Sequence, residues 1–313
     1  MARAIRCRIE GRSPGTEDIM KRLPAAPIPA DEPVEIWIDV SAHQGEIDWP
    51  QVARAEAFVS DVRVGPVVGV IVRVGEGKDV DRYAVRNLQA AHAAGLRIGV
   101  YQYFRADRDG ATQAAQILET LRVAGVPVEF VAVDREAGED DNLPAGIVDG
   151  TADIDPRVVT REALDLCAAL ELAGLRVWIY AGQWIHWEYS QRRPELIEPF
   201  ARWPLWVPSY SSRAKAPMIP VNVAGKPHPW PTWAAWQFAG SEGVPGRVAG
   251  VRGRVDVNRV RVRFLERPAE AVVPSPSLLA EARDELHAIA LRLKAAHPVE
   301  AAAVLRAADE IAR

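Results

Sequence analysis

Short apolar segments alternate with helix-length segments that end in glycine across residues 35–181. The apolar segments are rich in β-branched residues, as in Val67–Val74 (VVGVIVRV), which is the composition of buried strands. The longer segments between them are followed by Gly95, Gly125 and Gly174, and glycine is the residue most favoured just after a helix. This alternation predicts a parallel sheet with helical crossovers, which belongs to the α/β class.

The order of the elements indicates how that sheet is arranged. Strands are expected at Glu35–Val40, Val67–Val74, Arg97–Phe104, Glu129–Asp134 and Arg176–Ala181, and helices at Trp49–Phe58, Val80–Ala94, Gly110–Ala124 and Val158–Ala173. Beyond these, short helices are expected around Gln183–Tyr189 and Pro194–Phe200, and strands at Pro204–Val207, Trp233–Phe238 and Gly253–Asn258. Five strand–helix repeats followed by three further strands favour a barrel over an open sheet, although periodicity does not establish closure.

Proline-rich stretches divide the chain into an N-terminal extension with linker (1–33), a barrel domain (34–267), a second linker (268–276) and a C-terminal helical segment (277–313). The extension contains an alternating stretch, IRCRI, which predicts either a strand that pairs with another protein's sheet or a frayed terminus. The C-terminal segment carries a short a/d seam typical of a coiled coil. It could pack on the barrel, form a homo-oligomer, or dock on a partner.

Composition excludes several classes of function. A net charge of −4 and a pI near 5.9 argue against nucleic acid as a partner. Cys7, Cys167 and the six histidines form no metal-ligand spacing, so no metal and no cofactor are expected. The chain has no apolar run of about 18 residues, and its first residues are too charged for a signal peptide. We therefore expect no membrane insertion and no export by the usual signal.

Two carboxylates, Asp134 and Glu136, stand two residues apart at the end of a predicted strand. Residues i and i+2 of a strand face the same side, with Cα atoms roughly 6–7 Å apart. Like charges at that separation raise one pKa, which suits a general acid, although a solvated strand end is the alternative. Asp39 ends the first predicted strand and Asp256 lies at the end of the last. In a parallel barrel, all four would share the rim that carries site residues.

Eight sequence motifs resemble, in order, those of glycoside hydrolase family 25 lysozymes (N-acetylmuramidases). They are Ile38–Trp49 (IDVSAHQGEIDW), Arg73 with Glu76-Gly77, Asp81 and Asn87, Gly99–Arg105 (GVYQYFR), Val133–Glu136 (VDRE), Ile179-Tyr180, Pro204-Leu205-Trp206, Trp236-Gln237-Phe238, and Val255–Asn258 (VDVN). The resemblance covers about residues 33–264. It implies an irregular (β/α)5β3 barrel that hydrolyses the β-1,4 bond between N-acetylmuramic acid and N-acetylglucosamine in peptidoglycan.

The resemblance also assigns roles to the acidic residues. By position, Glu136 corresponds to the general acid/base and Asp134 to its partner carboxylate. Asp39 and Asp256 correspond to two further site aspartates that hold the water and the charge network. His43, in the first motif, is expected to support the site by hydrogen bonding rather than to act as a catalyst.

Aromatic and basic residues complete the predicted site. Sugars stack on aromatic rings, so the candidates for cleft walls are Tyr101, Tyr180, Trp206 and Trp236, with core packing as the alternative for each. Arg105 is expected either to hold the acidic cluster by a charge-assisted bond or to be a surface arginine. The family usually has an apolar residue between the two acids, where this chain has Arg135, and the loop 138–156 is long and acidic.

The leading hypothesis is a peptidoglycan muramidase of phage or prophage type, acting on the cell wall either as a free endolysin or as part of a virion or tail-like particle. The alternative is a wall-binding structural subunit of such a particle that uses a lysozyme-like barrel for adhesion. Residues 1–33 and 277–313 motivate the assembly hypothesis.

Overall fold

The computed structural model describes residues 32–135, 154–182, 193–210, 229–240 and 244–265. It also describes the backbone of four short strands: β1 (Arg22–Pro24), β10 (Met218–Pro220), β11 (Asn222–Val223) and β12 (Lys226–Pro227). Several predictions fall outside these residues, namely those on Glu136, the N-terminal alternating stretch, the helix around 183–189, most of the acidic loop and the C-terminal helical segment. β1, near the N-terminal linker, pairs antiparallel with β10.

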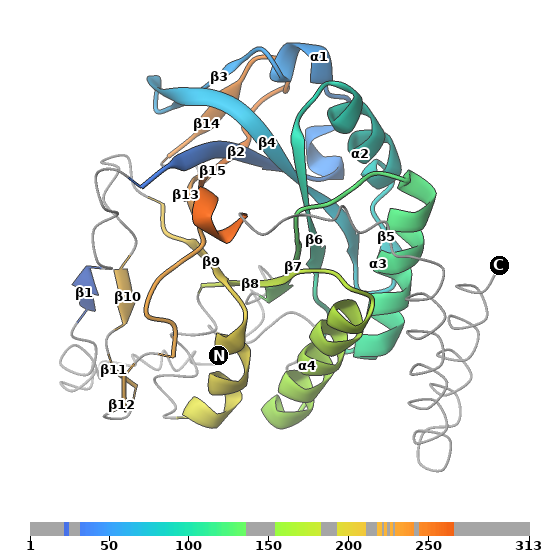
Figure 1. Ribbon diagram of the computed structural model, residues 1–313, viewed down its shortest axis with the longest axis vertical. Coiled ribbons are helices and arrows are strands. Elements are labelled where there is room, and N and C mark those ends of the chain that lie inside the picture. The colour runs from blue at the N-terminus through green and yellow to red at the C-terminus, as the bar shows by residue number, and fades with distance from the viewer. Residues whose placement is uncertain are drawn as a thin grey trace, which may run out of the picture.

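Within the described residues, eight strands close into a barrel (Figure 1). In spatial order they are β2 (Val34–Val40), β4 (Val62–Glu76), β6 (Arg97–Tyr103), β7 (Val131–Arg135), β8 (Val177–Ala181), β9 (Leu205–Pro208), β13 (Ala235–Ala239) and β15 (Asp256–Arg261). The first seven pair in parallel. β15 runs antiparallel to both β13 and β2 and closes the ring. The predicted barrel is confirmed.

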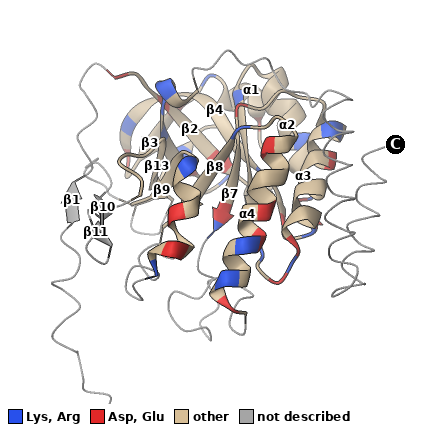
Figure 2. Cartoon of the chain, turned by 60° about the horizontal axis from the view of Figure 1, so that its bottom comes forward, with Lys and Arg blue, Asp and Glu red and all other residues tan. Residues whose placement is uncertain are grey.

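Helices cover the outside of the parallel strands (Figure 1). They are α1 (Trp49–Val52), α2 (Ala84–Ala93), α3 (Gly110–Ala124) and α4 (Pro156–Leu172), with 3-10 turns η1 (Ala42–Gln44), η2 (Pro194–Leu196), η3 (Glu198–Arg202) and η4 (Val262–Phe264). α3 has the predicted bounds because both of its ends are marked in the sequence. The Asp109 side chain accepts a hydrogen bond from the Thr112 N–H, and Gly125 adopts a left-handed conformation. Acidic and basic residues lie along the helices, whereas most of the strand surface is uncharged (Figure 2).

The helix expected over Trp49–Phe58 is wrong in its second half. The helix ends at Val52, and Glu56–Val59 forms β3, which pairs antiparallel with the first half of β4. Ser60 and Asp61 make the connecting turn with φ values of 46° and 64°, as a tight hairpin requires. The side chains of β3 alternate between buried and more exposed positions, which is the period of a strand. β14 (Gly246–Val248) extends this hairpin, and β5 (Asp79–Val80) pairs with the end of β4.

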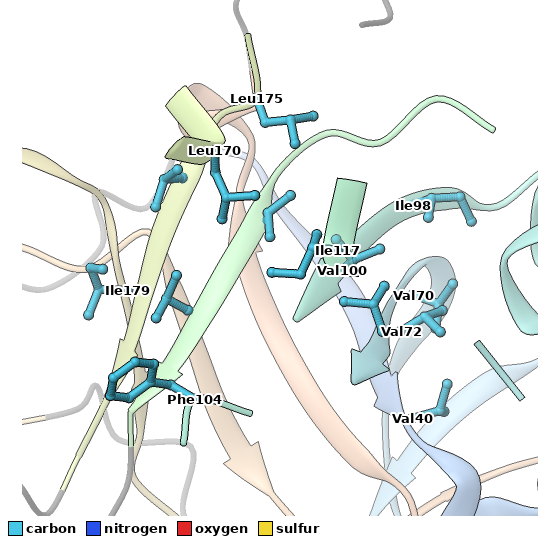
Figure 3. Close-up of a cluster of buried hydrophobic side chains, with 14 of the residues drawn as sticks. Val40, Val70, Val72, Ile98, Val100, Phe104, Ile117, Leu170, Leu175 and Ile179 are labelled. Atoms are coloured by element: carbon cyan, nitrogen blue, oxygen red, sulfur yellow. The ribbon is translucent and has the colours of Figure 1, made fainter. Parts of the chain in front are cut away.

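Two apolar layers hold the barrel together. The larger lies between the strands and the helices, and Figure 3 shows part of it, including Val70, Val100 and Ile179. The smaller fills the barrel interior, where Phe130 stacks on Trp178 with ring centroids 3.8 Å apart. The interior is therefore packed with aromatic rings and supports the rim above it.

Candidate active site

Three of the four predicted acidic residues meet at one rim of the barrel. Asp39 is the penultimate residue of β2, and Asp134 is the penultimate residue of β7. Asp256 is the first residue of β15, not near its end as expected. It still lies on the rim because β15 runs antiparallel to β2 and pairs Asp256 with Asp39. Glu136 follows the last residue of β7 and lies outside the described residues.

Asp39 is a buried carboxylate that is held by two amide donors. Its side chain is 5% exposed and accepts hydrogen bonds from Asn258 Nδ2 at 2.7 Å and from Gln237 Nε2 at 3.0 Å. Burial raises the pKa of Asp39, and hydrogen bonds from Asn258, Gln237 and Asp256 oppose that rise. Burial is the largest effect, so the site favours a proton on Asp39 more than water does.

Gln237 connects the two aspartates of the closing strands. Its Nε2 donates to Asp39 and lies 3.5 Å from Asp256 Oδ2, while its Oε1 accepts from Tyr180 at 2.8 Å and Tyr210 at 2.9 Å. A phenol hydroxyl that donates to the carbonyl oxygen leaves the NH2 group directed at the carboxylates. The aromatic residues therefore fix the orientation of the amide. Sequence reasoning placed Gln237 in a motif but gave it no role.

Asn258 is fixed in the same way. Its Oδ1 accepts a hydrogen bond from Trp206 Nε1 at 2.8 Å, and its Nδ2 donates to Asp39. Trp206 contacts Tyr180 edge-on, with ring centroids 4.6 Å apart, and also lies edge-on to Tyr101. These rings form the floor beneath the carboxylates.

Tyr101 lies on β6, between the floor and the rim, and is partly exposed. Burial raises its pKa well above the usual value, and the charge of Asp39 raises it further. Arg73 opposes the rise, while Asp134 and Asp256 add to it. Tyr101 therefore keeps its proton at neutral pH and presents a hydroxyl donor beside the acidic residues.

The aromatic residues expected to line the cleft divide into two groups. Tyr180 and Trp206 are 5% and 1% exposed, and both face the barrel interior, so they support the site from below. Trp236 is fully buried in the outer layer, where its Nε1 donates to the Ser209 carbonyl and its ring packs against Phe238. The expectation that Trp236 forms a cleft wall is therefore corrected. Adjacent strand residues face opposite sides, so an inward Gln237 places Trp236 outward.

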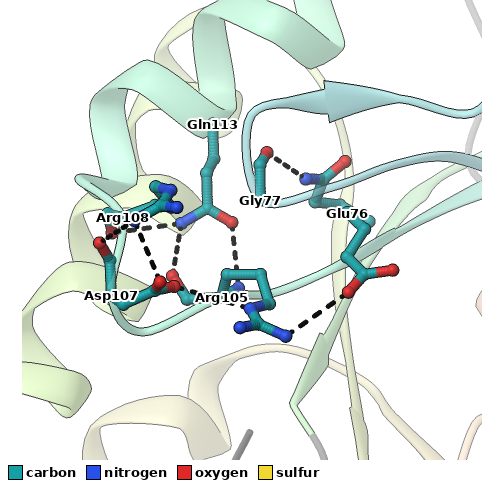
Figure 4. Close-up of polar contacts among 7 residues, drawn as sticks. Glu76, Gly77, Arg105, Asp107, Arg108 and Gln113 are labelled. Carbon is teal, nitrogen blue, oxygen red and sulfur yellow. Dashed lines mark hydrogen bonds and ion pairs between the residues drawn. The ribbon is translucent and has the colours of Figure 1, made fainter. Parts of the chain in front are cut away.

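Arg105 lies just beyond β6 and binds to the loop around it (Figure 4). Its Nη1 is 3.4 Å from Glu76 Oε1 and its Nε is 3.5 Å from Asp107 Oδ1. Its backbone N–H donates to Gln113 Oε1 at 3.1 Å. Gln113 also donates to the Arg105 and Arg108 carbonyl oxygens, which fixes the turn before α3. The hydrogen bonds defined for Asp39 come from the amides of Gln237 and Asn258.

A second buried carboxylate organises the segment that follows Asp39. Asp81 accepts hydrogen bonds from Arg73 Nε at 2.8 Å, from the Ala42 N–H at 2.8 Å and from the Tyr83 N–H at 2.9 Å. It thereby joins η1, which follows β2, to the end of β4. His43 is exposed on η1, and its backbone N–H donates to Ser41 Oγ.

No group of three or more potential metal ligands occurs among the residues that the structure describes. Over the same residues, none of the helices is long and apolar enough to cross a membrane. Cys167 is buried in α4, and burial raises the pKa of its thiol, so it is not poised as a nucleophile.

A closed barrel with carboxylates gathered at the rim where its parallel strands end is an arrangement that suits glycoside hydrolysis. The model of glycosyl hydrolases family 25 matches residues 38–247, and the chain belongs to that family. A comparison with curated protein sequences gives no significant match.

Solved structures show the same fold. The bacterial lysozyme from Streptomyces coelicolor is 22% identical with a TM-score of 0.53, and the match covers 74% of this chain and 95% of that one. A family 25 lysozyme from Aspergillus fumigatus is 20% identical with a TM-score of 0.51, covering 73% and 94%. The modular autolysin LytC from Streptococcus pneumoniae, solved with a synthetic peptidoglycan ligand, is 22% identical with a TM-score of 0.51. That match covers 72% of this chain but only 46% of the autolysin.

Proposed function

We propose that the protein is a peptidoglycan muramidase that hydrolyses the β-1,4 bond between N-acetylmuramic acid and N-acetylglucosamine. The observation that carries the proposal is the meeting of Asp39, Asp134 and Asp256 at one barrel rim in a chain of family 25. Glycoside cleavage requires one protonated and one ionised carboxyl group across the scissile bond. Neighbouring carboxylates in different environments push one pKa upward and leave others ionised, which is the pairing that this reaction needs.

Each acidic residue has a distinct part in this proposal. Glu136 gives the proton to the leaving oxygen and later takes one from water, and Asp134 is its partner carboxylate. Asp134 is 4% exposed and pairs in register with Tyr103 and Tyr180, which places it on the inward face of β7. Asp39 and Asp256 hold the water and the charge network.

Substrate contacts are proposed for the groups that reach the rim. The Tyr101 hydroxyl is a donor beside the carboxylates, and Arg105 lies two residues beyond the last residue of β6. Tyr210, which sequence reasoning missed, is 45% exposed while its hydroxyl bonds Gln237. An exposed ring with a fixed hydroxyl suits a sugar face. No motif in the sequence marks Tyr210, which lies two residues beyond β9.

The test is muropeptide release from purified cell walls by the wild type, Glu136→Gln and Glu119→Gln. Glu119 is a matched control because its carboxylate is exposed on α3 and pairs with Arg122. We expect release of products with N-acetylmuramic acid at the reducing end by the wild type and Glu119→Gln, and a loss of at least 100-fold in Glu136→Gln. Reducing-end N-acetylglucosamine would exclude a muramidase, and equal release by all three would exclude Glu136 as the acid.

Delivery to the wall is a separate part of the proposal. We infer a phage- or prophage-encoded enzyme, released at lysis or carried in a virion or tail-like particle through residues 1–33 and 277–313. Light scattering of the full chain and of a chain ending at Arg267 tests self-association. If the full chain and the shortened chain are both monomeric, the C-terminal segment does not form a homo-oligomer. A wild type that binds walls but releases nothing would favour the adhesive subunit instead.

A further inference from the structure

Arg135 occupies an unusual place for a charged residue. It is the last residue of β7, between Asp134 and Glu136, and is only 2% exposed. Val131 and Val133 of the same strand belong to the outer apolar layer, whereas Ala132 belongs to the barrel interior. Arg135 shares the alternation of the two valines, so its side chain points into the layer between the barrel and the helices.

The guanidinium reaches two elements of that layer. Its Nη1 donates to Thr160 Oγ1 on α4 at 3.5 Å, and the same hydroxyl lies 3.5 Å from the Leu196 carbonyl oxygen in η2. Its central carbon lies 5.5 Å from the centroid of the Phe200 ring in η3, within the range of a cation–π contact. One side chain thus joins the end of β7 to α4 and to the turns that follow β8.

An apolar residue would fill this space without the cost of removing a guanidinium from water. The planar, multi-donor group instead provides directional contacts to groups on different elements. These contacts act on the residue between the two proposed catalytic carboxylates. A shift of Arg135 along or across the strand moves both neighbours, and a misplacement of about 1 Å at a catalytic group costs roughly 100-fold in rate.

We propose that Arg135 is a positioning residue, which holds the end of β7 against α4 and thereby sets the geometry of Asp134 and Glu136. This inference rests on the proposed muramidase function. Arg135 itself does not contact the substrate, because its side chain lies on the opposite side of the strand from Asp134. Two groups give Arg135 this role: its guanidinium, and the Thr160 hydroxyl that connects the guanidinium to the Leu196 carbonyl oxygen.

The test is the steady-state kinetics of Arg135→Met, Arg135→Lys, Thr160→Val and Thr160→Ser on solubilised peptidoglycan, per mole of folded protein. Thr160→Ser is the matched control for Thr160→Val because it keeps the hydroxyl. Arg161→Met controls for the loss of an arginine, since Arg161 is exposed on α4. Thermal unfolding is measured alongside, and Thr160→Val keeps the test valid if Arg135→Met does not fold.

We expect kcat to fall about tenfold or more in Arg135→Met with KM within about twofold, and to recover in part in Arg135→Lys. Thr160→Val should lower kcat, whereas Thr160→Ser and Arg161→Met should match the wild type. Unchanged kcat in folded Arg135→Met or Thr160→Val, with only a lower melting temperature, would overturn the positioning role and leave the proposed function intact. A wild type that releases no muropeptides would overturn both.

Discussion

Asp39 and Asp256 stand opposite each other on neighbouring antiparallel strands, and the amide nitrogen of Gln237 lies within 3.5 Å of a carboxylate oxygen of each. Neutral amides therefore contact both of these aspartates. Because those amides are oriented by Tyr180, Tyr210 and Trp206, the site's charge balance depends on the aromatic floor beneath it.

Gln237→Met should therefore lower both stability and kcat, although methionine and glutamine have similar sizes. The change removes the donor to Asp39 and leaves the Tyr180 hydroxyl without its buried acceptor. The loss should be about 1–3 kcal/mol of unfolding free energy and at least tenfold in kcat on solubilised peptidoglycan, measured by urea unfolding and steady-state kinetics. Gln89→Met, a change on α2 far from the rim, is the control. Wild-type kcat in Gln237→Met would contradict the prediction.

Asp39→Asn should change how stability depends on pH. Burial raises the pKa of Asp39 above 3.8 in the folded state, so the folded protein binds the proton more tightly than the unfolded chain. The stability linked to that proton is fully present below pH 3.8 and is lost as pH rises through the folded pKa, with a slope of up to about 1.4 kcal/mol per pH unit. Asparagine does not titrate.

The measurement for this prediction is urea unfolding of the wild type and of Asp39→Asn from pH 3.5 to 8. The unfolding free energy of Asp39→Asn minus that of the wild type should increase with pH. A constant difference would show that the hydrogen bonds from Asn258 and Gln237 balance burial, and a decreasing difference that they outweigh it; either result would contradict the prediction.

Asp81→Asn tests the link between η1 and β4. Asp81 accepts three hydrogen bonds, one of them from the Arg73 guanidinium, and breaking a buried ion pair by removing one charge costs about 3–5 kcal/mol. We expect a loss of roughly 2–4 kcal/mol by urea unfolding, since asparagine keeps one acceptor. Glu46→Gln removes the exposed ion pair with Arg86 and should leave the free energy of unfolding almost unchanged, because water screens that pair. Similar losses in the two variants would refute the proposed importance of Asp81.

Gly69→Ala should destabilise the barrel through crowding. A Cβ at Gly69 would lie 2.4 Å from the Trp37 ring, and overpacking a dense core costs about 1–3 kcal/mol. Trp37→Leu leaves a cavity, so both single variants should be less stable than the wild type by thermal unfolding. In the double variant the new methyl group enters the space left by the ring. The double variant should therefore be more stable than the sum of the two losses predicts, and strict additivity would contradict the crowding.

The sequence favoured a barrel because its first strands are apolar and alternate with helices that end in glycine, although closure of the sheet is visible only in the strand pairing. The sequence pattern was misleading at Glu56–Val59, where a four-residue strand was predicted as the second half of a helix. Asp256 was placed on the correct rim from the wrong end of its strand, since one-dimensional periodicity does not give strand direction. The roles of Gln237 and Asn258 become visible only when β15 is known to lie between β13 and β2. Trp236 was misassigned because a motif identifies residues without saying which way each one faces.

Because β15 closes the barrel, the acidic site can be completed only at the end of synthesis and folding of the barrel. Asn258 and Asp39, joined by a 2.7 Å hydrogen bond, are 219 positions apart in the chain. Contacts between residues so far apart in the chain form late, because closing the long loop between them costs conformational entropy. A nascent chain that ends before residue 256 has Asp39 but neither Asp256 nor the amide of Asn258. The complete network around Asp39 is thus absent from every chain that ends before β15, and it forms only once the last barrel strand has been made and docked.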